Sequence, residues 1–344
     1  MSMAEESSGP GRRAATAALI TLAVLAVLFF MREAQTIVVP LLTAVLLAVV
    51  GEAAVGWLCR FRFPRVLAVL LVVTVVALAL FGIGILVGSS VQQLTERAPA
   101  YQARLEPTLE ALLGSDEDSA RRRYVAGVIE QISPGATFSV AARLLSGVRD
   151  VFANAFLMIL LMVFILLEAP LLRTKLETIG GAAQAWTSIA ASVRSYLAIK
   201  SLVSLATGLL IALFLLVLDV DFAILWGLLA FMLNYIPNLG SILAALPVVL
   251  LALVQKGTGD ALIIAAGYLL VNVVIGNFIE PRLMGRGMGL STLVVVLSLI
   301  LWGWLLGPVG MLLSVPLTTS IRIAMEGHES TRSVAVILGR EVRR

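Results

Sequence analysis

Long stretches without a charged side chain recur through most of this 344-residue chain. A bilayer core about 30 Å thick needs about 20 mostly apolar residues for each helix that crosses it, and a crossing helix satisfies its own backbone hydrogen bonds. The sequence therefore predicts an all-α polytopic membrane protein. Its ten apolar segments are residues 14–31, 34–51, 66–91, 151–167, 201–218, 222–236, 239–255, 261–279, 289–306 and 309–321.

Composition agrees with the membrane class and limits the chemistry. Charged residues make up 13% of the chain, against about 25% in a typical soluble domain. The basic residues are scattered between apolar runs and form no patch, so no nucleic-acid partner is predicted. Cys59 and His328 are the single cysteine and histidine, which excludes an intramolecular disulfide and a Cys/His metal cluster. No cofactor is predicted.

The distribution of Lys and Arg predicts the orientation in the membrane. Arg12 and Arg13 precede the first apolar run, as in a signal peptide, but the run is long and lacks a small-residue cleavage site before Arg32. A retained span is therefore predicted. Short loops on one side carry most of the basic residues, whereas those on the other side carry only Arg32 and Lys256. The positive-inside rule then places both termini in the cytoplasm.

Two stretches are amphipathic instead of uniformly apolar. Residues 92–150 predict a helical arm outside the membrane, resting on the outer surface or on neighbouring subunits. Residues 171–200 predict a cytoplasmic helix whose Arg194 and Lys200 either contact lipid headgroups or line an inner vestibule. The predicted organisation is a tail and three spans (1–91), the arm (92–150), a fourth span and cytoplasmic helix (151–200), a transport core (201–326) and a cytoplasmic tail (327–344).

Pro and Gly interrupt the predicted transport core twice, in NYIPNLGSILAALP (234–247) and LGPVGMLLSVP (306–316). Proline removes a backbone donor and glycine relaxes the chain, so a helix cannot continue through either break. The resulting arms are at or below the length needed to cross a bilayer, which predicts two re-entrant hairpins. The single helix between them gives the hairpins opposite orientations, as in transporters built from inverted repeats.

Polar residues gather at the breaks and on the helix between them. Tyr268, Asn272, Gly276 and Glu280 recur at intervals of four and share one helix face, which should face protein or water because lipid offers no partner. The candidate solute-binding residues are Asn234, Pro237, Asn238, Gly240, Ser241, Tyr268, Asn272, Asn277, Gly307, Pro308 and Gly310.

Glu280 and Arg282 are candidates for coupling or gating. A structural role is open for the same residues: Asn234 and Asn238 would then only satisfy the broken backbone, and Glu280 would pair with Arg282 or Arg286 at the inner interface.

Three motifs in this region, IPNLGSILAALP, IEPRLMGRGMGLS and GWLLGPVGMLLSVP, together resemble the autoinducer-2 exporter family of bacterial inner-membrane permeases. The sequences NYIPN and GRGMGLSTLVV most resemble those of the branch that contains the quorum-signal exporter. The similarity is strongest over residues 194–319. It implies export of autoinducer-2, a small neutral polyhydroxylated furanone derivative, by alternating access. It also implies a homo-oligomer, with a pentamer as one candidate, and hairpins that move in an elevator-like manner.

Three functions remain open on the sequence. The first is a secondary transporter that exports a small polar solute. The second is a Na⁺(Li⁺)/H⁺ antiporter with Glu280, Asp219 or Glu52 as coupling acid, which the scarcity of mid-span carboxylates disfavours. The third is a non-transporting membrane scaffold. A serine protease at Gly240 and Ser241 would lack its histidine, because His328 lies beyond the last span, so no enzyme is predicted.

Overall fold

The computed structural model describes residues 10–113, 155–178, 181–237, 239–284, 290–327 and 331–339. These residues are helical, as predicted, apart from short turns and one isolated bridge between Leu290 and Gly339. The helices are α1 (Pro10–Glu33), α2 (Gln35–Arg60), α3 (Arg65–Leu113), α6 (Ala155–Thr178), α7 (Gly181–Val217), α8 (Ala223–Leu233), α9 (Leu239–Lys256), α10 (Thr258–Asn272), η1 (Val273–Ile279), α11 (Glu280–Met284), α12 (Thr292–Glu326) and α13 (Arg332–Leu338).

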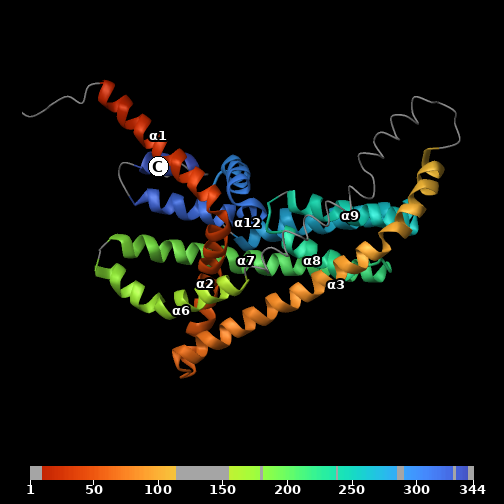
Figure 1. Cartoon of the computed structure of the whole chain (residues 1–344), viewed down its shortest axis with the longest axis horizontal. Helices are drawn as coiled ribbons and strands as arrows, with labels where there is room; N and C mark the ends of the chain where they lie inside the picture. Colours follow the sequence, from red (N-terminus) through yellow and green to blue (C-terminus); the bar gives the residue numbers. More distant parts are fainter. Residues whose placement is uncertain are drawn as a thin grey trace, which may run out of the picture.

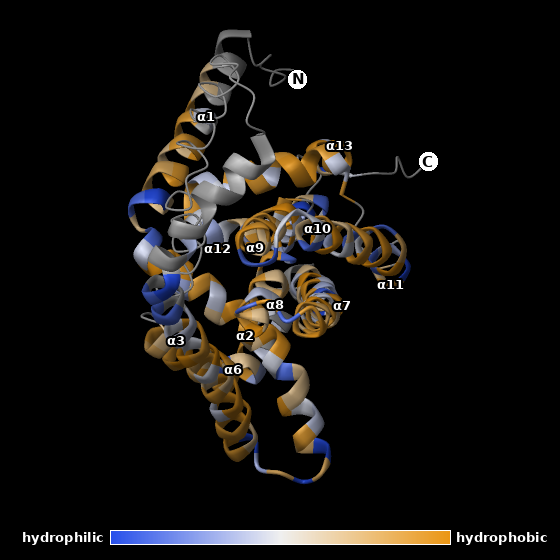
Figure 2. Ribbon diagram, turned by 90° about the vertical axis from the view of Figure 1, so that its right-hand side faces the viewer, coloured by the Kyte–Doolittle hydropathy of each residue, from blue (hydrophilic) through white to orange (hydrophobic). Residues whose placement is uncertain are grey.

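Among the described residues, seven helical stretches are long and apolar enough to cross a membrane. Figure 2 shows that hydrophobic residues cover most of the length of the helices, and many large apolar side chains are exposed on the protein surface, where a bilayer would cover them. The seven stretches are Gln35–Arg60, Arg65–Ser90, Ala155–Leu172, Gln184–Val217, Leu239–Lys256, Thr258–Met284 and Thr292–Glu326.

Two helices run further than the predicted boundaries. Residues 181–200 of the predicted cytoplasmic helix and the span after it form one continuous helix, α7, because the chain between Gly181 and Gly208 contains no glycine or proline that would end it. Residues 171–178 of the predicted cytoplasmic helix instead form the end of α6. Likewise α3 continues past the end of its apolar run to Leu113. Residues 114–150, the rest of the predicted outer arm, lie outside the described residues, as do residues 151–154 at the start of the predicted fourth span.

The extension of α3 is attached to the turn that precedes α8. The Tyr101 hydroxyl donates to Asp221 Oδ2 at 2.5 Å, and Arg97 Nη1 lies 3.3 Å from the same oxygen. Burial, together with the hydrogen bond and charge of Asp221, raises the pKa of Tyr101 to about 12, so the hydroxyl remains a donor at neutral pH. The extension of α3 and the start of α8 are therefore held together at one end of the molecule.

Helix α7 runs through the middle of the molecule, with α8 and α9 towards one of its ends and α6 towards the other (Figure 1). It contacts α2, α6, α8, α10, η1, α11 and α12. Helices α7 and α8 approach each other closely where Gly208 faces Gly227: a Cβ added to Gly208 would lie 2.7 Å from the Gly227 carbonyl oxygen. A separate core joins α2, α3 and α6, where Arg65 bonds both Glu52 and the Leu166 carbonyl oxygen.

Both predicted breaks are present, and each separates two helical arms that fold back on one another. The first break separates α8 from α9 after Leu233. The second lies inside α12 at Gly307, where φ is 67° and ψ is −154°. Across that second break, Trp302 Nε1 donates to Thr318 Oγ1 at 3.0 Å. We call these the first hairpin (α8 and α9) and the second hairpin (the two arms of α12).

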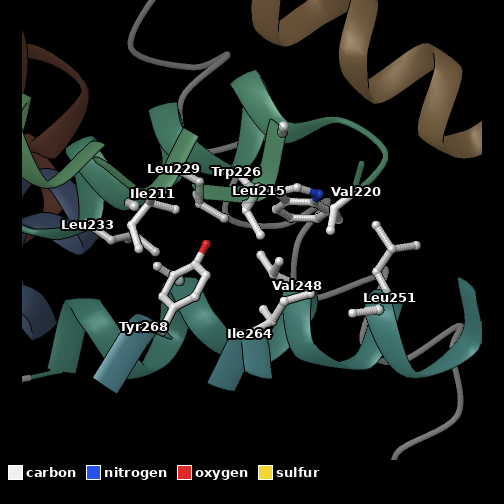
Figure 3. Close-up of a cluster of buried hydrophobic side chains, with 14 of the residues drawn as sticks. Ile211, Leu215, Val220, Trp226, Leu229, Leu233, Val248, Leu251, Ile264 and Tyr268 are labelled. Carbon is white, nitrogen blue, oxygen red and sulfur yellow. The ribbon is translucent and has the colours of Figure 1, made fainter. Parts of the chain in front are cut away.

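The two hairpins share part of one core, where Leu299, Met311 and Leu312 of α12 pack with the first hairpin, but their other neighbours differ. The first hairpin forms the largest hydrophobic core with α7 and α10, in which Trp226, Ile211 and Ile264 are fully buried (Figure 3). The second hairpin places Trp302 and Leu306 against apolar side chains of α1 and α2. The first hairpin is therefore the one that borders α10, the helix that carries the predicted polar stripe.

Candidate functional site

A cavity of about 520 Å³ lies between the first hairpin, α7 and the helix formed by α10, η1 and α11. This volume is within the usual range for small-molecule pockets, about 300–1,000 Å³. Its walls are mostly apolar, with a few convergent polar groups. Those polar groups are Lys200, Asn234, Ser241, Tyr268, Asn272, Asn277 and Glu280.

The turn of the first hairpin brings Asn234 and Ser241 to the cavity. Asn234 Nδ2 donates to Ser204 Oγ of α7 at 3.0 Å, and the Tyr235 hydroxyl donates to Ser201 Oγ at 2.7 Å. These two bonds, one helical turn apart on α7, fix the turn against that helix. The Asn234 amide therefore does more than satisfy the broken backbone, because its bond goes to a side chain of a different helix.

The predicted polar stripe forms one wall of the cavity. All four of its residues, Tyr268, Asn272, Gly276 and Glu280, line the cavity. Asn277 joins them because residues 273–279 form a π-helix, whose wider turn shifts the helix register. Asn272 Nδ2 donates to the Tyr268 carbonyl oxygen at 2.8 Å. Nothing in the sequence distinguishes this π-helix from an ordinary helical turn.

A buried ion pair lies at one end of the cavity. Lys200 Nζ of α7 is 2.5 Å from Glu280 Oε1, and Lys200 is only 3% exposed. Glu280 therefore pairs with Lys200, and the expectation that it pairs with Arg282 is wrong. Arg282 is exposed and does not line the cavity. Arg286, the other expected partner, lies outside the described residues. Of the two roles expected for Lys200, the structure supports lining a vestibule over contacting headgroups.

The remaining predicted residues lie elsewhere. Pro237 lines the cavity, but Gly240 packs beneath the Leu233 carbonyl, where it lets the two arms of the first hairpin approach. Asn238 lies outside the described residues. The structure does not bring the second break to the cavity: Gly307, Pro308 and Gly310 belong to α12 and are absent from its lining.

Sequence reasoning offered Lys200 as a possible vestibule residue but did not connect α7 with the site. Ser201 and Ser204 hold the first hairpin, and Lys200 neutralises Glu280. The available signal was Lys200 itself, a charged residue at the edge of a long apolar run, which in a membrane implies a nearby partner.

The cavity is suited to a neutral polar solute. Among the described residues that line it, the two charged side chains, Lys200 and Glu280, neutralise each other and the other polar groups are amides and hydroxyls, which bind hydroxyl and carbonyl groups without demanding a charge. Within the described residues, no group of three or more His, Cys, Asp or Glu side chains is placed to hold a metal ion.

The known proteins to which this chain is similar are transport proteins. The AI-2E family transporter profile matches residues 18–328. The chain is 44% identical over 316 residues to the AI-2 transport protein TqsA of Escherichia coli, covering 89% of this chain and 90% of that protein. It is 36% identical over 330 residues to a putative transport protein of Haemophilus influenzae, covering 92% and 94%. The putative transport protein YhhT of Escherichia coli is 34% identical over 314 residues, covering 89% of each chain.

Proposed function

The chain belongs to the AI-2E transporter family, and on that premise we propose that it exports autoinducer-2 through the cavity beside the first hairpin. The observation that carries the proposal is the meeting of Asn234, Tyr268 and Asn272 in one cavity of suitable volume. The 44% identity to a protein named for AI-2 transport supports the choice of solute. The proposal places the protein in a bacterial inner membrane with both termini in the cytoplasm.

The proposal includes re-entrant hairpins. At 1.5 Å per residue, the 11-residue α8 is about 16 Å long, well short of a bilayer core of about 30 Å. Opposite orientation is supported by the contacts of the two hairpins with α7. The open end of the first hairpin reaches Asp219, beyond the C-terminal end of α7, where Lys256 lies 3.8 Å away. The second hairpin begins beside Tyr196, in the first half of α7.

Alternating access is the mechanism that fits this arrangement. The cavity is bordered by the first hairpin, which in this proposal moves against α7 when its bonds to Ser201 and Ser204 break, and by a π-helix, a feature common at functional sites. Glu280 acts as a gating residue in this proposal, because its pair with Lys200 closes one end of the cavity. Arg282, exposed and next to that gate, remains a candidate for coupling. A homo-oligomer is part of the proposal and rests on family membership.

The double variant Asn234→Ala/Asn277→Ala tests the site. We expect it to export autoinducer-2 from reconstituted liposomes at about a tenth of the wild-type rate, since each lost hydrogen bond is worth about 0.5–1.5 kcal/mol. Ser298→Ala is the matched control: Ser298 is buried and bonds the Val295 carbonyl oxygen, but it does not line the cavity. An unchanged rate in the folded double variant would remove the site assignment.

A further inference from the structure

A small gap adjoins the cavity on its α7 side. It shares Asn234, Ser241, Tyr268 and Asn272 with the cavity, so the two spaces meet along these four side chains. The other walls come from the cores of α7, α8 and α9, namely Thr207, Ile211, Ala230 and Ala244. None of the described residues that line the gap carries a charge.

The Tyr268 hydroxyl is buried beside this gap without a partner. Tyr268 is 2% exposed, and its oxygen makes no hydrogen bond to any described residue. In Figure 3 the hydroxyl is directed away from α10, towards Ile211 and Leu229 of the hydrophobic core. A buried hydroxyl without a partner is unfavourable, and in native proteins such groups usually have a function.

Three polar neighbours of Tyr268 each donate one hydrogen bond within the protein. The Thr207 hydroxyl donates to the Val203 carbonyl oxygen at 2.9 Å, and the Asn234 and Asn272 amides donate to Ser204 and to the Tyr268 backbone. The Asn234 and Asn272 amides keep a second N–H and a carbonyl oxygen each, and Ser241 and Tyr268 add hydroxyls, so the gap offers both donors and acceptors. A neutral hydroxyl group matches this set, because it accepts one hydrogen bond and donates another. A carboxylate or phosphate would find no cation in the gap.

The gap is closed in this structure, since it has no room for a water molecule. Tyr268 nevertheless lines the larger cavity as well, so a small rotation of its ring or shift of the hairpin would connect its hydroxyl with the cavity. We propose that the partner of Tyr268 is one hydroxyl group of the transported solute, and that solute binding widens the gap into a subsite for that hydroxyl. This inference rests on the proposed function.

Tyr268→Phe tests the subsite through two measurements, the unfolding temperature without solute and the KM for autoinducer-2, both of which should increase. Without solute, the variant should unfold at a higher temperature than the wild type, because it removes a buried hydroxyl that has no partner. In liposomes, the KM for autoinducer-2 should rise about 5–30-fold, because the solute hydroxyl would be left buried without its donor. Thus the variant gains stability and loses solute affinity.

Tyr101→Phe is the matched control. Tyr101 is also buried, but its hydroxyl is bonded to Asp221, and it lines neither the cavity nor the gap. We expect this variant to unfold at a lower temperature, because it leaves Asp221 without that donor, and to keep the wild-type KM.

Each failure has its own signature. An unchanged KM in Tyr268→Phe, with wild-type transport intact, overturns the subsite and leaves the proposed function standing. A lower unfolding temperature in Tyr268→Phe also overturns the subsite, since the hydroxyl would then have a partner within the protein. If wild-type liposomes move no autoinducer-2, the proposed function fails, and the subsite for that solute fails with it.

Discussion

Lys200→Met should lower the free energy of unfolding by about 3 kcal/mol, the lower end of the cost of removing one partner from a buried ion pair. Lys200 is 3% exposed and lies 2.5 Å from Glu280, so the substitution leaves a carboxylate without its counter-charge in a region of low dielectric. The lower end applies because the Glu280 side chain keeps 19% exposure to the cavity. Unfolding of the purified protein in detergent micelles measures the effect.

A second variant separates the charge from the packing. Lys200→Met/Glu280→Gln removes both charges and should recover most of the lost stability, because a pair of neutral groups is less costly to bury than one unpaired charge. Lys175→Met is the control, since its 3.5 Å pair with Glu168 has both side chains more than half exposed and should change stability by less than 1 kcal/mol. Equal losses in the single and double variants would contradict the prediction.

Gly240→Ala should destabilise the protein by about 3 kcal/mol, the upper end of the usual cost of overpacking. A Cβ at this position would lie 1.8 Å from the Leu233 carbonyl oxygen and 2.5 Å from its carbon. The atoms in the way are backbone, so the arms of the first hairpin must separate. Thermal unfolding of the variant in detergent measures the loss, and export should fall with it because the cavity borders this hairpin.

Gly82→Ala provides the contrast for the glycine prediction. Gly82 lies inside α3 with open space around its Cα, so alanine there should be neutral or stabilise by up to about 1 kcal/mol through its higher helix propensity. A neutral Gly240→Ala would show that the two arms are not in close contact. Gly310 has the same role in the second hairpin, where a Cβ would lie 2.0 Å from the Trp302 carbonyl oxygen.

The same use of glycine in both hairpins shows why the sequence repeat was informative. Pro-Gly spacing predicted that each arm is interrupted near these positions; the structure ends the first arm at Leu233, three residues before the predicted boundary at residue 236, and interrupts α12 at Gly307. The prediction assigned both glycines to solute binding, however. Instead, each glycine packs against a backbone carbonyl oxygen of the first arm of its own hairpin, which leaves no room for a side chain. This contact depends on how the arms fold back and is not visible in the local sequence pattern.

The stripe on α10 could be predicted because intervals of four place residues on one face whatever surrounds the helix. Tyr268, Asn272 and Glu280 duly line the same cavity. The Lys200 pair could not be predicted in this way, since 80 positions separate it from Glu280. Charge alone offered Arg282 and Arg286 as nearer partners, and only the packing of α7 against α11 brought Lys200 into contact.

The sequence alone therefore determined the features that depend on composition and on neighbouring residues: the membrane class, the helical fold, the two breaks and the polar face. Local backbone chemistry and the cost of exposing peptide groups to lipid are sufficient for these. The tertiary structure decided which hairpin borders the cavity, which cation neutralises Glu280, and that Tyr268 is buried without a partner. These depend on contacts between distant helices, where shape complementarity and the desolvation of polar groups determine the result.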